Sequence, residues 1–322
     1  MKVLYFPPTE GDILLNYIIT HYYHSGFSVE CGDTILIFDY WLGEEGELDE
    51  EMQLTPERLS LFSHIYVFIS HDHIDHMDPV VFTWKDLPGI QYVVSSDMPV
   101  GTRGRRMAPG DTIAFSEDVG VTAFDSTDPG VSFLVNFRGL NLFHAGDLNF
   151  WHWRDESTLP EIEEADMEFR KALQPLEKER VDIAFFPLDP RQGTMFEAGA
   201  NYFILSVKPR ILIPMHYFHR AEVAVEYSRT ASCRSTEVIA MPLYGDKLGV
   251  EMAEDGYLNL YAPQEEEAAD TAGEAADPLL AEDDPFLESD LPLAQLAEPP
   301  ETPAPEGENG AGNGGGSEPP KA

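Results

Sequence analysis

The eight residues 71–78 constrain what this chain can fold into more than any other stretch. They read His-Asp-His-Ile-Asp-His-Met-Asp and follow directly on an apolar run with the composition of a buried strand. If His71 and His73 lie on extended backbone, their side chains point to the same face. Asp75 and His76 then stand at a turn, where they can reach a second centre about 3.5–4 Å from the first, as in two-metal sites. The run therefore predicts a metal site in preference to a solvated His-rich loop.

The His-x-His-x-Asp-His order of this run resembles the metal-binding motif of the metallo-β-lactamase-fold hydrolases. Gly146-Asp147, which follows an apolar run about 70 residues later, matches the next signature of that superfamily. Pro214-Met215-His216 matches a third, a histidine at a strand end. His24-Ser25-Gly26-Phe27 is similar to the stretch that marks the branch including ascorbate-6-phosphate lactonase. The resemblance implies an α+β fold, a four-layer αββα sandwich.

The resemblance also implies two divalent metal ions, with zinc expected and manganese or iron as alternatives. It assigns His71 and His73 to the first ion, Asp75, His76 and His216 to the second, and Asp147 to both as a bridge. In such a site a metal-bound water loses a proton near neutral pH and attacks an ester, lactone or phosphoester of a small substrate. Asp75 is the candidate catalytic residue, because it can also take the proton from the nucleophile.

The sequence departs from the superfamily pattern at the first metal. That ion usually has a third histidine between the His cluster and the bridging acid, but no histidine stands between His76 and His144. Asp125 or Asp128, in the expected stretch, would supply an oxygen instead, which shifts the preference from zinc towards manganese or iron. Alternatively, the first site is weak and only the second is tight. The sequence leaves both alternatives open.

Two further residues are candidates for a supporting role. His144 stands three positions before Asp147, and the ligand histidine of the superfamily lies further upstream, so His144 is interpreted as a supporting or structural residue. Asp39 ends a predicted strand. There it either supports the metal site from behind, as an acid at this place often does in the superfamily, or simply caps the strand.

Four residues are candidates for the wall of a substrate pocket. His24 opens a predicted strand, although a lone histidine is more often structural. Trp151 and Trp153 follow the bridging acid and either wall a pocket or plug the core beneath the sheet edge. Arg191 lies in a polar loop after a predicted strand, where it is a candidate for orienting a substrate anion.

The net charge of −38 restricts the partners. Residues 263–322 carry 16 acids and one base, and residues 1–262 carry 42 acids and 19 bases, so both parts are strongly acidic. The negative electrostatic potential of such a chain repels phosphate groups. It therefore disfavours nucleic acid and anionic membrane surfaces as partners. A small anionic substrate stays compatible, because bound metal ions dominate the local field.

The composition predicts two parts. Residues 1–262 are expected to form the hydrolase domain, and residues 263–322, rich in Glu, Ala, Pro and Gly, a disordered acidic tail. The alternative function is a metal-binding interaction protein with little or no turnover, whose tail recruits a partner. The two cysteines form no CxxC pair, and no run is long enough for a signal peptide or a membrane span, so a cytoplasmic protein is expected.

Local patterns predict several elements. Residues 28–30 and 34–39 are expected to form a hairpin that turns at Gly32-Asp33. Residues 90–137 alternate strand and turn patterns and are expected to be antiparallel. Asp78-Pro79 predicts the start of a helix, and residues 159–180 predict another that Pro175 kinks or splits.

Overall fold

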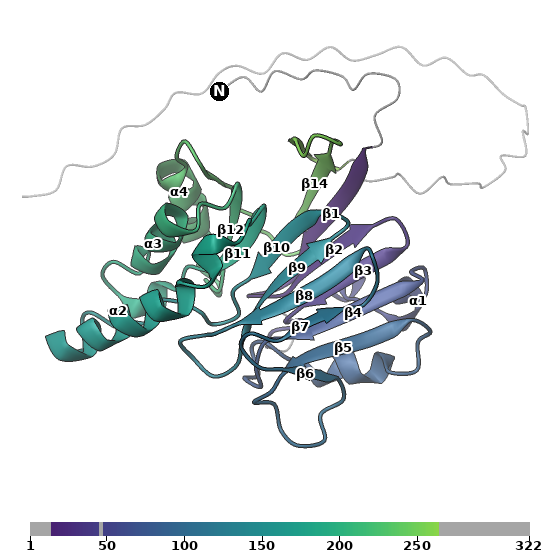
Figure 1. Ribbon diagram of the computed structural model, residues 1–322, viewed down its shortest axis with the longest axis horizontal. Coiled ribbons are helices and arrows are strands. Elements are labelled where there is room, and N and C mark those ends of the chain that lie inside the picture. Colours follow the sequence, from purple (N-terminus) through teal and green to yellow (C-terminus); the bar gives the residue numbers. More distant parts are fainter. Residues whose placement is uncertain (1–13, 45–47, 264–322) are drawn as a thin grey trace, which may run out of the picture. The chain divides into compact units, whose positions relative to one another are not determined.

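The computed structural model describes residues 14–44 and 48–263, which form two β-sheets with helices (Figure 1). The first sheet has eight strands in the order β15-β14-β1-β2-β3-β4-β5-β6, and the second has seven in the order β13-β12-β11-β10-β9-β8-β7. The strands of the first sheet are β1 Leu15–His21, β2 Phe27–Cys31, β3 Thr34–Phe38, β4 His64–Ile69, β5 Ile90–Ser95, β6 Arg105–Met107, β14 Lys247–Met252 and β15 Leu258–Tyr261. Those of the second are β7 Thr112–Ala114, β8 Val119–Phe124, β9 Ser132–Phe137, β10 Leu140–His144, β11 Ile183–Pro187, β12 Ile211–Met215 and β13 Glu237–Val238.

The helices flank the two sheets on opposite sides (Figure 1). The α-helices are α1 Pro56–Leu59, α2 Leu159–Leu173, α3 Ala198–Ser206 and α4 Ala221–Ala231, and the short 3₁₀ helices are η1 Glu50–Met52, η2 Pro79–Trp84, η3 Leu176–Lys178 and η4 Pro190–Gln192. In Figure 1, α2, α3 and α4 lie beside β11 and β12, whereas α1 lies beside β4 and β5. This order of layers confirms the predicted αββα sandwich.

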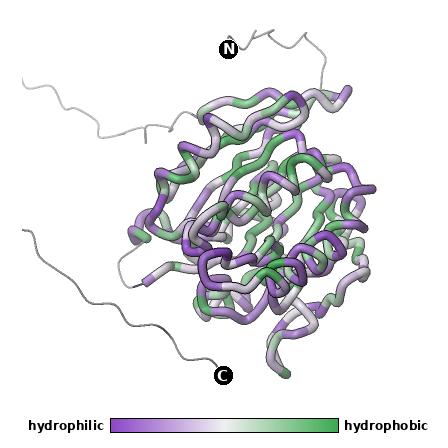
Figure 2. Tube along the Cα trace, turned by 90° about the vertical axis from the view of Figure 1, so that its left-hand side faces the viewer, coloured by the Kyte–Doolittle hydropathy of each residue, from purple (hydrophilic) through white to green (hydrophobic). Residues whose placement is uncertain are grey.

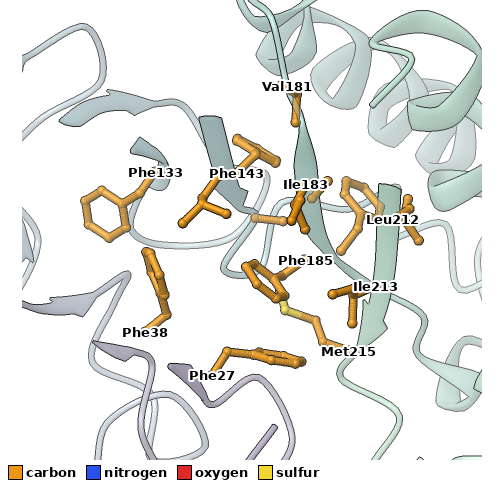
Figure 3. Close-up of a cluster of buried hydrophobic side chains, with 14 of the residues drawn as sticks. Phe27, Phe38, Phe133, Phe143, Val181, Ile183, Phe185, Leu212, Ile213 and Met215 are labelled. Atoms are coloured by element: carbon orange, nitrogen blue, oxygen red, sulfur yellow. The ribbon is translucent and has the colours of Figure 1, made fainter. Parts of the chain in front are cut away.

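The central strands of the first sheet are buried on both faces. Along β3, Leu36 and Phe38 belong to the core between the sheets, whereas Ile35 and Ile37 pack in a second core beneath the short helices. This alternation follows from the two-residue period of a strand. Figure 3 shows the inter-sheet core, where Phe27 of the first sheet faces Phe185 of the second with ring centres 4.5 Å apart. Figure 2 shows the corresponding hydropathy, with hydrophobic strands inside and hydrophilic stretches on the outer helices.

The topology brings several strand ends to one place. β3 and β4 pair in parallel in the first sheet, and β10, β11 and β12 pair in parallel in the second. The carboxyl ends of parallel strands meet at the same edge of a sheet. The residues that follow these strands in the sequence include Asp39, His71, Asp147, Asp189 and His216. The two edges meet, because Asp39 of one sheet and Asp147 of the other both contact His76.

Most of the predicted elements are confirmed, and one pairing was wrong. The hairpin turns at Gly32, whose φ of 60° suits glycine, and the chain breaks between α2 and η3 at Pro175. Residues 90–137 are not uniformly antiparallel, since β5 pairs in parallel with β4, and β6 with β5. The reason is the η2 segment, which carries the chain back between β4 and β5 and so makes a parallel crossover. The helix that starts after Asp78 is this 3₁₀ segment.

Within residues 14–44 and 48–263, no helix is long and apolar enough to cross a membrane. The predicted boundary between a folded domain and an acidic tail stays a prediction. The last strand, β15, ends at Tyr261, and the tail residues 264–322 lie outside the described part of the chain.

Candidate metal centre

Four predicted site residues form one compact group, which we call the closed group: His24, Asp75, His76 and His216. Each offers a ligand atom, and these atoms all lie within 4.8 Å of one another. Asp75 Oδ2 is 3.4 Å from His24 Nε2 and 4.0 Å from His216 Nε2. The three histidines are buried and Asp75 is partly exposed. These residues follow β1, β4 and β12, so three distant segments meet here.

Three others form a second group, which we call the open group: His71, His73 and Asp147. Their ligand atoms also lie within 4.8 Å of one another. The rings of His71 and His73 have centres 4.5 Å apart, and His71 Nε2 is 3.4 Å from Asp147 Oδ2. His73 is exposed, whereas His71 and Asp147 are buried, so this group is the one that faces solvent.

Asp147 lies between the two groups and presents a different oxygen to each. Its Oδ2 faces His71, while its Oδ1 is 2.9 Å from His76 Nε2 and 3.2 Å from His216 Nε2. Burial alone would raise the pKa of Asp147, but the neighbouring rings of His76 and His216 outweigh it and hold the pKa well below its usual range. An ionised carboxylate in this position could bind one metal ion through each of its oxygens.

The candidate ligand atoms lack other partners, which favours a bound cation between them. Nε2 of His71, His76 and His216, both ring nitrogens of His24, and Asp147 Oδ1 are buried without a hydrogen-bond partner among the described residues. Each such atom would cost about 1–3 kcal/mol if left unpaired. Nitrogen ligands about 2.0–2.1 Å from a zinc ion stand about 3–3.4 Å from one another. The contacts of Asp147 and the contact between His24 and Asp75 match that spacing, so the residues fit divalent cations.

A buried carboxylate holds one ligand of each group in place. His76 Nδ1 donates to Asp39 Oδ2 at 2.8 Å. Ser70 donates to Asp39 through its backbone nitrogen at 2.8 Å and its hydroxyl at 2.6 Å, and that hydroxyl is 2.9 Å from His71 Nδ1. Both imidazoles therefore use Nδ1 for support and leave Nε2 for a metal. Of the two alternatives for Asp39, these contacts favour support of the site over a plain strand cap.

No family model matches this chain. It is 24% identical over 220 residues to a "UPF0173 metal-dependent hydrolase" of Heliobacterium modesticaldum, an alignment that covers 62% of this chain and 82% of the relative. A protein of the same description from Opitutus terrae is 24% identical over 234 residues and covers 66% of this chain and 90% of its own length. A solved metallo hydrolase of Ignicoccus hospitalis superposes with a TM-score of 0.54 at 18% identity, over 73% of this chain and 98% of that one.

The chain has the metallo-β-lactamase fold. The sequence-based prediction of a metal-dependent hydrolase with this fold is confirmed at that general level. The more specific resemblance to the ascorbate-6-phosphate lactonase branch is not tested by these relatives.

A second buried carboxylate beside the site, Asp189, was not assigned a role from the sequence. Asp189 follows β11, and its Oδ2 is 3.2 Å from His216 Nδ1. Burial alone would raise the pKa of Asp189, but contacts with His216 and Arg191 outweigh it and lower the pKa to about 2. Its position two residues after a strand that ends near the site was the available signal. Arg191 donates to both oxygens of Asp189, and its guanidinium lies 4.2 Å from the centre of the Phe218 ring. A role of Arg191 in binding a substrate anion stays a prediction.

Among the candidate supporting residues, His144 has both ring nitrogens engaged. Its Nδ1 accepts a hydrogen bond from the backbone of Gly146 at 3.2 Å, so its Nε2 donates to the carbonyl of Ser25 at 2.8 Å. The ring also stacks on Phe38. A fully engaged imidazole suits the structural interpretation and leaves no atom for a metal.

The two candidate substitutes for the missing histidine lie in the loop between β8 and β9. Asp125 is exposed and Asp128 is half-buried. Neither belongs to a ligand group among the described residues. Burial and the charge of Asp147 raise the pKa of Asp128 above its ordinary value. The described structure therefore leaves the open group with two histidines and the shared carboxylate.

Two tryptophans flank the centre. Trp151 Nε1 donates to the carbonyl of Asp147 at 2.8 Å, and the Trp151 ring lies 5.7 Å from that of His216. Trp153 stacks on Trp151 with ring centres 6.0 Å apart, and both side chains are half-buried. Trp151 thus contacts two ligand residues, His216 and Asp147, and the contact of the pair with a substrate stays a prediction.

Proposed function

We propose that this protein is a dinuclear hydrolase that cleaves an ester, lactone or phosphoester of a small substrate. The observation that carries the proposal is the convergence of two ligand groups on opposite oxygens of Asp147. The proposed ligands are those that the sequence indicated, with His71 and His73 at one ion, Asp75, His76 and His216 at the other, and Asp147 at both.

When bound, two divalent ions would lower the pKa of water towards neutrality and polarise the carbonyl or phosphoryl oxygen of the substrate. Zinc is the proposed metal, because imidazole ligands predominate in both groups. Manganese or iron are the alternatives if Asp125 or Asp128 adds an oxygen ligand to the open group. The chain's own contribution is to orient two of the ligand imidazoles: Asp39 holds His76, and Asp189 lies beside His216.

Asp75 is the proposed proton acceptor. Burial alone would raise its pKa, but the nearby rings of His24 and His76 outweigh it and hold the pKa below its usual range. The carboxylate is therefore ionised at neutral pH and, being partly exposed, can be reached by a water. Trp151 and Trp153 are proposed to exclude bulk water and contact the substrate, as tryptophans do at pocket walls.

The proposed partner is a small molecule, since the acidic charge of the chain disfavours polyanions. A cytoplasmic location is proposed as well. Its support is that Cys31 and Cys233 are both free, which suits a reducing compartment.

The test combines metal content with turnover. Wild type, His73→Ala and His64→Ala are loaded with zinc, desalted and analysed by mass spectrometry, then assayed on a phosphodiester, an aryl ester and a lactone. His64 is an exposed histidine at the start of β4, so its replacement is a matched control. We expect two zinc ions per chain and turnover in wild type and in the control. In His73→Ala we expect turnover to fall by more than about 100-fold, which exceeds the cost of removing a supporting residue. Tight metal binding without turnover of any substrate would favour the binding-protein alternative.

A further inference from the structure

We propose that His24 is itself a metal ligand, and that the centre is therefore asymmetric. The closed group would hold its ion with five protein side chains, namely His24, Asp75, His76, His216 and Asp147. The open group would hold its ion with three, which leaves positions for a water and a substrate. This inference rests on the proposed dinuclear centre, and it assigns His24 to the metal instead of to the pocket wall.

The position of the imidazole supports a ligand role. His24 is 1% exposed, and both ring nitrogens are buried without a hydrogen-bond partner among the described residues. Its ring centre lies 3.9 Å from that of His216 and 5.7 Å from that of His76. Nε2 is 3.4 Å from Asp75 Oδ2, which is the spacing of two ligands on one ion. His24 Nε2 thus points at a carboxylate inside a buried cluster of three histidines, where the imidazole and the carboxylate can share one ion.

The backbone also holds His24 at some cost. Its φ of 55° lies in the left-handed region, as does the φ of 64° at His216. The two residues are joined, because the His216 N–H donates to the His24 carbonyl at 3.2 Å. The turn around His24 is closed by Gly26, where an added Cβ would lie 3.0 Å from the Tyr23 carbonyl oxygen. Unfavourable backbone conformations that meet at one point are typical of functional sites.

The asymmetry follows from what surrounds each group. The three histidines of the closed group are buried, and a closed ligand set is typical of ions that hold structure. In the open group His73 is exposed, and a site with few protein ligands is typical of catalytic metals. Exchange of water and entry of substrate are therefore expected at the ion held by His71 and His73.

The experiment measures zinc binding by competition with a chromogenic chelator, separately from turnover. His24→Phe removes both nitrogens and keeps a ring against Phe218, and His24→Glu keeps an atom that can bind a metal at similar reach. His21→Phe is the matched control, because His21 is a buried histidine near the same turn that belongs to neither group. We expect the tighter zinc site to weaken by more than about 100-fold in His24→Phe, by less than about 10-fold in His24→Glu, and not at all in the control.

Unchanged zinc affinities in His24→Phe would overturn the proposal and return His24 to the pocket wall. If that variant does not fold, the visible spectrum of cobalt-loaded His24→Glu decides, because exchanging nitrogen for oxygen changes the spectrum only if position 24 binds the ion. An unchanged spectrum overturns the proposal. Two tight ions in wild type without turnover would contradict the proposed hydrolase but not this inference, whereas turnover with unaffected His24→Phe binding would contradict the inference alone.

Discussion

The closed and open groups differ in how firmly the fold holds them. In the closed group, His76 donates to Asp39 and His216 lies beside Asp189, so two imidazoles are each backed by a buried carboxylate. In the open group, His71 reaches Asp39 only through Ser70, and His73 is exposed. Because backing carboxylates fix ring orientation and raise ligand basicity, the closed group should bind its ion more tightly. One centre thus combines a rigid half with an accessible half.

The largest expected effect is at the residue that the two halves share. Asp147→Asn removes one anionic ligand from both groups. The open group then keeps two histidines, whereas the closed group keeps His24, Asp75, His76 and His216. Zinc content should therefore fall from two ions to about one ion per chain, and turnover by more than about 100-fold, beyond the loss seen for supporting residues. Metal analysis and steady-state kinetics measure both. If Asp147→Asn kept two tightly bound ions, Asp147 would not be a ligand that the two groups share.

The second-largest effect is expected on thermal stability, when the metal ions are removed. A ligand present at 100 times its Kd stabilises the native state by about 2.7 kcal/mol, which corresponds to about 5–10 °C in Tm for a domain of this size. We expect that shift when a chelator is added to the zinc-loaded protein in a thermal melt. His76→Ala should already have lost most of the zinc-dependent shift and His73→Ala little of it. Equal losses in the two variants would remove the thermodynamic difference between the groups.

The two backing carboxylates give a direct comparison. Asp39→Asn disturbs His76 directly and His71 through Ser70, so both zinc sites should weaken by about 10–100-fold. Asp189→Asn disturbs His216 alone, so only the tighter site should weaken, by a similar factor. Zinc titration with chelators of different strength separates the two sites. A uniform loss in both variants would show that Asp189 also supports the open group.

Much of the site could be predicted because its parts are local. His71, His73, Asp75 and His76 are contiguous, so their proximity follows from chain connectivity, and the apolar run before them marks a strand end. Asp147 and His216 are distant in the chain and were indicated by the resemblance of Gly146-Asp147 and Pro214-Met215-His216 to superfamily signatures. In the structure each follows a buried strand of a parallel set. The fold followed from these motifs together.

What the sequence did not reveal depends on tertiary contacts. His24 looked like a wall residue, because nothing near it in the chain shows that its turn bonds to the backbone of His216. Asp189 looked like part of a polar loop, since its contact with His216 spans two strand ends. The parallel pairing of β5 was missed because the strand pattern alone does not encode direction, and the crossover over residues 70–89 contains only the short 3₁₀ helix η2.

The smallest effect is expected at the tryptophans, and it tests whether Trp151 supports the shared Asp147 by hydrogen bonding or by packing. Trp151 Nε1 donates to the carbonyl of Asp147, so Trp151→Phe removes one hydrogen bond worth about 1 kcal/mol. Zinc affinity should therefore fall by about five-fold at both sites, because Asp147 serves both. Trp153→Phe is the matched control, since Trp153 stacks on Trp151, and its replacement should change zinc affinity by less than about two-fold. Similar losses in both variants would mean that the tryptophan pair acts through packing, and that the hydrogen bond from Trp151 to the Asp147 carbonyl adds nothing of its own.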